Sequence, residues 1–151
     1  MINAVGETVA EKPAFKNAFR RRRCLVLANS FYEWKKEAGS KVPMRIGLKD
    51  WEPFAFAGLW ESWTAKGTGE VLRSCTIITC APNELMAPIP NRMPIILPEA
   101  AEATWLNPAM EDPAVLKGLL VPFPSDRMEA YPVSTLVNSP KSDTPLVIQA
   151  A

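Results

Sequence analysis

Fifteen prolines spread along 151 residues are the feature that most limits what this chain can fold into. Their share is about twice the roughly 5% of average proteins. A proline inside a helix removes a backbone hydrogen bond and clashes with the preceding turn, so helices between prolines must be short. Within sheets, prolines are confined to edges, bulges and strand ends. We therefore predict an α+β fold with a mostly antiparallel β-sheet or open barrel and a few short helices.

The hydrophobic pattern places these elements. Helix signals occur at 7–23, where Pro13 lies in the first turn, and at two segments that open with Pro98 and with the pair Asp112-Pro113. Apolar or alternating runs predict six or seven strands, with Pro43 marking an edge strand and 71–81 a central one. The expected strands are 24–28, 31–36, 42–50, 53–63, 71–81, 92–97 and part of 130–140. We see no internal repeat and expect a single domain over 1–151.

Composition excludes several classes of protein. No stretch reaches the ~18 apolar residues that a membrane span needs, so no membrane partner is expected. Three cysteines, Cys24, Cys75 and Cys80, form no CxxC pair and follow no secretory signal, which favours a cytoplasmic location. Because the chain contains no histidine, it has neither a Ser-His nor a Cys-His dyad, and we expect no metal and no cofactor.

The cations are clustered although the net charge is only +1. Four arginines in a row, Arg20–Arg23, are followed by Lys35, Lys36 and Lys41. One interpretation is a solvated helix end and a lysine-protected sheet edge. The alternative is a stripe that binds the phosphates of a nucleic acid.

Glu33 and Trp34 are the most informative pair, in the run FYEWKK. On a strand, Glu33 shares a face with Phe31, and apolar surroundings would raise the pKa of its carboxyl group toward neutrality. It is then a candidate for proton transfer, unless it simply pairs with a lysine. Trp34, beside Lys35 and Lys36, is either a core residue or a ring on which single-stranded DNA stacks.

Two further polar residues are candidates. The side-chain amide of Asn3 either satisfies a backbone group or orients an oxyanion or a sugar hydroxyl. Arg92, held between Pro90 and Pro94, forms either a structural salt bridge or a bidentate phosphate contact.

Four segments in order resemble the motifs of the SRAP family, the SOS response-associated peptidase-like or abasic-site processing proteins: INAVGETVAEKPAF, RRCLVLANSFYEWKK, TIITCAPNELMAPIPNRMPIIL and YPVSTLVN. The resemblance covers nearly the whole chain. It implies an SRAP-like fold and binding of single-stranded DNA at abasic sites in the DNA damage response. The family chemistry is a covalent crosslink through an N-terminal cysteine, with hydrolase, protease and lyase activities also attributed to it.

The resemblance also assigns residues. It implies that Asn3 and Glu33 are catalytic. It implies that Trp34 lies at the DNA face and that Thr79 and Arg92 lie near the lesion and the phosphates. The cation pattern adds Lys35 and Lys36 as candidate phosphate contacts, which gives five predicted DNA-binding residues.

The chain departs from the family pattern at several positions. The cysteine nucleophile and the stretch that follows it are absent, so we expect a domain that is truncated at its N-terminus. The family histidine before the NRMP segment is replaced by Pro90, an arginine is replaced by Val5, and Asn29-Ser30 stands where Asp-Gly is usual. An uncovered sheet edge would favour self-association.

Three hypotheses follow for the chemistry. The chain is a decayed gene fragment that keeps some affinity for DNA, a non-catalytic single-stranded DNA-binding or interaction module, or an active enzyme. In the last case the α-amine of Met1 could form a reversible imine with the aldehyde of an abasic site. Whether the chain is an enzyme is left open by its sequence.

Overall fold

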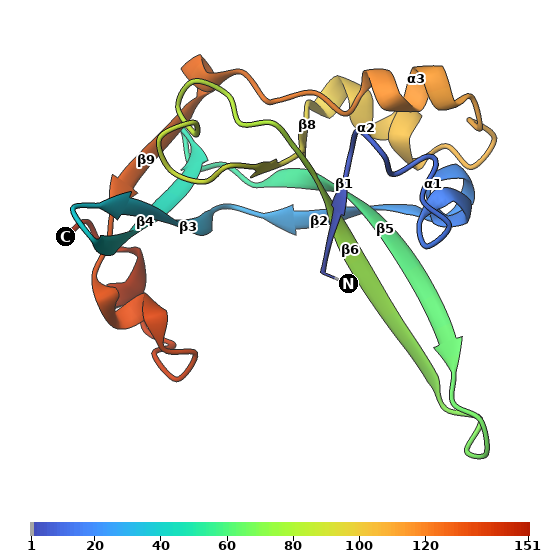
Figure 1. The fold of residues 1–151 in the computed structure, drawn as a ribbon, viewed down its shortest axis with the longest axis horizontal. Helices are drawn as coiled ribbons and strands as arrows, with labels where there is room; N and C mark the ends of the chain where they lie inside the picture. Colours follow the sequence, from blue (N-terminus) through green and yellow to red (C-terminus); the bar gives the residue numbers. More distant parts are fainter. Residues whose placement is uncertain (1) are drawn as a thin grey trace. The chain divides into compact units, whose positions relative to one another are not determined.

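The computed structural model describes residues 2–151, which form two compact units (Figure 1). The first comprises the chain up to Leu27 together with Phe54–Cys80 and Pro94–Phe123. The second comprises Ala28–Pro53, Ala81–Met93 and Pro124–Ala151. Each unit is assembled from three separate stretches of sequence, so long-range strand pairing holds each one together.

The first unit is built around a sheet with the strand order β1–β6–β5–β2, to which two short strands are added by the pairs β7–β6 and β8–β5. The pairs β5–β6 and β5–β8 are antiparallel, whereas β1 runs parallel to β6. As the sequence predicts, the β-branched segment of β6 is a central strand. The strands are β1 (Asn3–Val5), β2 (Arg23–Ala28), β5 (Phe54–Thr64), β6 (Val71–Cys80), β7 (Met93–Pro94) and β8 (Ile96–Leu97).

Three short helices complete this unit: α1 (Lys16–Arg21), α2 (Glu99–Leu106) and α3 (Pro113–Gly118). α3 starts as predicted, because the Asp112 carboxylate accepts a hydrogen bond of 2.9 Å from the Ala114 N–H. The helix expected at 7–23 is wrong in its extent: it begins only at Lys16, after a series of turns. Phe19 of α1 packs edge-to-face on Trp105 of α2, and both are fully buried.

The second unit contains an antiparallel sheet of the order β3–β4–β9, formed by β3 (Phe31–Glu37), β4 (Ser40–Leu48) and β9 (Met128–Pro132). The prediction that Pro43 marks an edge strand is wrong, since β4 is the central strand. The carbonyl of Pro43 accepts a hydrogen bond from Val133, beyond the end of β9. The backbone nitrogen of Pro43 faces the same side, so the missing N–H falls where the ladder with β9 has already ended.

The C-terminal stretch of this unit is held by tyrosine hydroxyls. It contains short 3₁₀ helices at Ser125–Arg127, Thr135–Asn138 and Pro145–Ile148. Tyr32 donates a hydrogen bond to the carbonyl of Val147 (3.1 Å) and Tyr131 to that of Ile148 (2.6 Å). Beyond β9, this stretch adds one isolated bridge, between Val133 and Ala150.

The predicted fold class, α+β with mostly antiparallel strand pairing, is confirmed, although residues 2–151 form nine strands rather than six or seven. No helix among the described residues has the length and apolar character needed to cross a membrane.

Candidate functional site

An open cavity in the second unit brings together most of the polar candidates of that unit. Its volume is about 590 Å³. One wall is the β3–β4 hairpin and the other is the loop 87–91. From the hairpin it is lined by Glu33, Trp34, Lys36 and Lys41. A carboxylate, an aromatic ring and two ammonium groups therefore face one space that is large enough for a nucleotide-sized group.

Glu33 is half-buried in this cavity, and that burial raises the pKa of its carboxyl group above the usual value. Within residues 2–151 the carboxylate forms no ion pair, so the alternative of a glutamate paired with a lysine does not describe Glu33. A carboxyl group with a raised pKa is protonated for a larger fraction of molecules near neutral pH. It can therefore donate a proton to a carbonyl or hydroxyl oxygen in the cavity.

The indole ring of Trp34 is held by a hydrogen bond and is partly exposed to solvent. Its indole N–H donates a hydrogen bond of 2.7 Å to the side-chain oxygen of Asn138, and 36% of the residue is exposed. The hydrogen bond holds the indole plane, so the exposed part of the ring is presented in one orientation. Such a ring can stack on a base.

The lysines that follow Trp34 differ from each other. Lys35 forms an ion pair with Glu37 at 2.5 Å. Lys36 pairs in strand register with Lys41 and lines the cavity, whereas Lys35 pairs with Val42 and is not among its lining residues. The predicted DNA contact is thus better placed at Lys36 than at Lys35.

Asn3 and Thr79 lie in the first unit, on the parallel pair β1–β6. Asn3 is exposed and pairs with Ile77, and Thr79 pairs with Val5. The hydroxyl of Thr79 donates a hydrogen bond of 3.1 Å to the carbonyl of Ala4, which fixes its rotamer. The proposed imine-forming amine belongs to Met1, which lies outside the described residues.

Arg92 directly follows the cavity-lining segment and is half-buried. Pro90, the position at which the family resemblance implies a histidine, lines the same cavity as Glu33. A proline ring neither takes up nor releases a proton, so this position contributes shape alone and leaves Glu33 as the carboxyl group in the lining.

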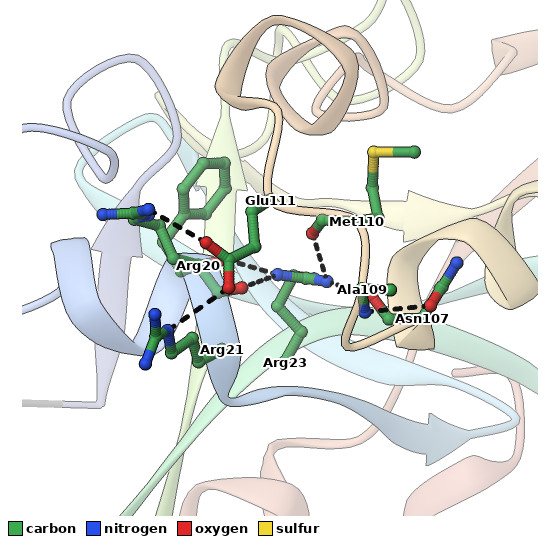
Figure 2. A network of polar contacts seen from close by, with 8 residues as sticks. Arg20, Arg21, Arg23, Asn107, Ala109, Met110 and Glu111 are labelled. Atoms are coloured by element: carbon green, nitrogen blue, oxygen red, sulfur yellow. Dashed lines mark hydrogen bonds and ion pairs between the residues drawn. The ribbon is translucent and has the colours of Figure 1, made fainter.

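The arginine run, which was a second candidate for phosphate binding, has partners within the protein (Figure 2). Arg20 and Arg21 both contact the carboxylate of Glu111, at 2.9 and 3.3 Å. Arg22 forms an ion pair with Glu61 at 2.6 Å. These side chains are partly exposed, so each ion pair contributes little to stability, but the pairs neutralise much of the charge that the sequence pattern suggested.

Arg23 is the structural centre of this run, being only 8% exposed. Burial lowers the pKa of its guanidinium and the carboxylate of Glu111 raises it, which leaves the group charged at neutral pH. Within the described residues its N–H groups donate to five backbone carbonyls, those of Phe19, Arg20, Trp105, Asn107 and Met110. Arg23 thus ties the end of α1 to the end of α2 and does not belong to a DNA-binding surface.

None of the three cysteines is among the residues that line the cavity in the part of the chain that the structure describes. Cys80 is buried, Cys24 is half-buried and Cys75 is exposed, and all three belong to the first unit. Burial raises the pKa of the Cys24 thiol, with a smaller effect from Cys75. Across residues 2–151 no group of three or more potential metal ligands comes together.

Three contributors to the cavity region were not assigned as site residues from the sequence, although Lys41 was part of the candidate phosphate-binding stripe and Pro90 was noted as the family histidine position. Lys41 reaches the cavity only because the hairpin folds it opposite Lys36. Asn138 orients Trp34 from more than one hundred residues away. The segment 87–91 forms the second wall. The hairpin pairing could have been inferred from the strand pattern around 37–41, but apart from the family resemblance nothing local to 87–91 or Asn138 indicates a role.

Comparison with known proteins relates the chain to one group. The family model of the SOS response associated peptidase (SRAP) matches residues 1–140. The abasic site processing protein YoqW of Bacillus subtilis is 52% identical over 151 residues, an alignment that covers 99% of this chain and 67% of that protein. The abasic site processing protein HMCES of Xenopus tropicalis is 32% identical, covering 95% of this chain and 48% of that protein.

A solved structure shares the fold. A crystal structure of a protein from Bacteroides thetaiotaomicron superposes with a TM-score of 0.92 at 35% identity, covering 99% of this chain and 65% of the other. The chain thus spans about two thirds of its bacterial relatives and about half of the vertebrate one. Since the family model matches most of the chain, this protein belongs to the SRAP family.

Proposed function

We propose that this protein binds single-stranded DNA at abasic sites and that the Glu33 cavity receives the base-free sugar. The observation that carries the proposal is a carboxyl group with a burial-raised pKa, next to an oriented Trp ring, in a cavity whose remaining charged side chains are lysines. The relatives named abasic site processing proteins support the choice of lesion.

The chemistry of the cavity suits an opened abasic sugar. The aldehyde of that sugar is polar and uncharged, and a protonated Glu33 can donate a hydrogen bond to its oxygen. Trp34 stacks on the neighbouring base, which is worth ~1–3 kcal/mol per base in single-stranded DNA complexes. Lys36 attracts the phosphate backbone. An undamaged nucleotide would place a base against the Glu33 carboxyl group, so we expect weaker binding of intact DNA.

The remaining site residues are part of the same proposal. We assign Asn3 a catalytic role through its side-chain amide, and Thr79, Arg92 and Lys35 supporting contacts to the DNA. We take the two compact units to be parts of one SRAP domain, since the family model extends across both. We place the activity in the cytoplasm, where bacterial DNA lies.

We propose further that this chain forms no stable crosslink of its own from residues 2–151. The thiols of Cys24, Cys75 and Cys80 do not line the cavity, and Pro90 stands in place of a proton-transferring histidine. In this form the protein is a lesion-binding module. The alternative is an enzyme that forms a transient imine, which borohydride would reduce to a permanent bond.

One experiment separates these possibilities. The protein is incubated with a single-stranded oligonucleotide that carries one abasic site, with and without borohydride, and the products are resolved on a denaturing gel beside a binding titration. Binding without an adduct in either arm supports the module. An adduct that requires borohydride shows an imine, and an adduct that survives heat without borohydride overturns the claim that crosslinking is absent. Equal affinity for intact and abasic DNA rejects the proposed lesion preference.

We also propose self-association through the sheet of the first unit. Ile2, directly before β1, and Leu27 on β2 are 82% and 75% exposed, and Trp63 on β5 is 58% exposed. Apolar side chains beside unpaired strand edges favour association. Light scattering at rising protein concentration tests this, and a constant monomer mass at high concentration would reject it.

A further inference from the structure

The tip of the β3–β4 hairpin holds two lysines directly opposite each other. In the strand register Lys36 pairs with Lys41, and Glu37 with Ser40. Side chains at directly opposed positions lie on one face of the sheet, with Cβ atoms about 4.5–5.5 Å apart. Like charges in such a pair destabilise the hairpin. An anion that binds between the two ammonium groups reduces this repulsion.

The turn keeps the two lysines in this register. Ala38 and Gly39, the two residues between the strands, both have positive φ angles, of 42° and 84°. Two consecutive positive φ values are the mark of the tight two-residue turns that match the twist of a hairpin. The hydroxyl of Ser40 donates a hydrogen bond of 2.9 Å to the carbonyl of Glu37 and closes the turn. The spacing of the lysine stems is therefore set by the backbone.

Neither lysine is neutralised by the protein. Within residues 2–151, Lys36 and Lys41 form no ion pair, whereas the neighbouring Lys35 is held by Glu37 at 2.5 Å. Glu37 is the acidic residue nearest to the pair along the hairpin, and Lys35 already occupies one of its carboxylate oxygens. Two adjacent positive charges are thus left facing solvent.

The pair also lines two hollows. Lys36 and Lys41 line the Glu33 cavity of about 590 Å³, and both line a second cavity of about 320 Å³ formed by residues 36–41 of the hairpin itself. A single strand that enters the first cavity and continues along the hairpin must pass the lysine pair. At that point its backbone presents a phosphodiester, which carries one negative charge.

We infer that Lys36 and Lys41 together bind one phosphodiester of the DNA strand, adjacent to the nucleotide in the Glu33 cavity, and that the hairpin hollow receives the next nucleotide. This inference rests on the proposed function and adds a defined phosphate subsite to it. Two ammonium groups contact one phosphate, so the two side chains act as a unit. Lys35, whose charge is engaged by Glu37, is not part of this subsite.

The salt dependence of binding tests the inference. Dissociation constants for an abasic and an intact oligonucleotide are measured by fluorescence anisotropy between 0.05 and 1 M NaCl, concentrations on the order of those that resolve counterion release. The proteins are the unmodified chain, Lys36→Gln, Lys41→Gln and the double variant. Lys49→Gln is the matched control, because it removes the same charge at the other end of β4, roughly 25 Å away along the strand.

One phosphate contact on single-stranded DNA contributes about 0.7 to the slope of log K against log salt. The double variant should therefore lose ~0.7 from the slope, equivalent to about eight-fold in relative affinity over that salt range. Lys49→Gln should keep the full slope. A loss of about 1.4 in the double variant, which is twice the value for one contact, would mean two separate phosphates and overturn the inference. An unchanged slope in the double variant would overturn it as well.

Two further readouts separate the alternatives. Inorganic phosphate should not raise the melting temperature of the unmodified chain more than that of the double variant. If it does so while the slope is unchanged, the ligand is a free phosphate and the inference is wrong. The predicted slope change with equal affinity for intact and abasic DNA would support the phosphate subsite and reject the lesion preference. A lesion preference with an unchanged slope would support the proposed function and reject the phosphate subsite. If the protein binds neither DNA, both proposals are rejected.

Discussion

Replacing Arg23 with methionine should be the most destabilising single change outside the apolar core. The guanidinium is 8% exposed and donates five hydrogen bonds, each to a backbone carbonyl (Figure 2). Methionine has a similar apolar stem and fills much of the same volume, so the variant isolates the loss of the donors from the loss of packing.

The magnitude follows from those five carbonyls. A hydrogen bond to a charged group contributes about 1.5–3 kcal/mol, and a buried acceptor left without a donor costs about 1–3 kcal/mol. The contributions do not add, because water reaches some of the freed carbonyls and the loop 107–111 can relax. We expect a loss of about 3–5 kcal/mol in the free energy of unfolding, which lies at the upper end for single substitutions. In a chain of this size that lowers the melting temperature by roughly 6–20 °C.

Thermal and urea unfolding followed by circular dichroism measure this loss. Arg21→Met is the matched control, since Arg21 forms an exposed ion pair with Glu111 and its removal should cost less than about 1 kcal/mol. Arg23→Lys keeps the charge but provides three donors in place of five, so its stability should fall between those of the two methionine variants. Equal stability of Arg23→Met and Arg21→Met would refute the idea that Arg23 clamps the two helix ends.

Three further predictions concern Glu33, the hairpin turn and the thiols. Because burial raises the folded-state pKa of Glu33, ionisation of its carboxyl group destabilises the fold as the pH rises above about 4.5. Glu33→Gln should therefore be at least as stable as the unmodified chain at pH 7, and the difference in stability should shrink toward pH 4. A less stable variant at pH 7 would show that the carboxylate has a cationic partner. Ala38→Asn should raise the melting temperature by ~1–4 °C, because asparagine tolerates the positive φ of 42° better than alanine, and an unchanged or lower value would argue against this turn. Iodoacetamide should modify the exposed Cys75 first, Cys24 more slowly because burial raises the pKa of its thiol, and Cys80 only on unfolding. Mass spectrometry of timed samples measures this order, and early modification of Cys80 would contradict its burial.

Local patterns were sufficient to predict much of the fold. The Asp112-Pro113 start of α3, the central position of β6 and the strand that carries Glu33 all follow from capping chemistry and hydrophobic pattern. The helix before Arg23 was predicted too long, because its first part forms hydrogen-bonded turns instead of helix. Pro43 was misplaced because the position of a strand within its sheet depends on where the partner strand ends, which no local pattern contains.

Individual site residues could be predicted from the sequence, but their arrangement in the folded protein could not. Glu33 and Trp34 stood out because a carboxylate and an aromatic ring adjoin a lysine pair in the sequence. The partner of Lys36 was not apparent, because it follows from the register of the turn at Ala38-Gly39. The arginine run was equally ambiguous, since its ion pairs and carbonyl contacts join segments about 40–90 residues apart, such as Arg22 with Glu61 and Arg20 with Glu111.

The measurement that tests the central claim most directly is the preference for abasic over intact single-stranded DNA in Glu33→Gln. Glu129→Gln is the matched control, since it removes the same charge from β9 of the same unit and lies outside both the Glu33 cavity and the hairpin hollow. If the Glu33 cavity receives the base-free sugar, the unmodified chain and Glu129→Gln bind abasic DNA more tightly than intact DNA. Glu33→Gln should then bind intact DNA as before and lose the preference. A preference that survives in Glu33→Gln, or that is absent from the unmodified chain, would contradict the assignment.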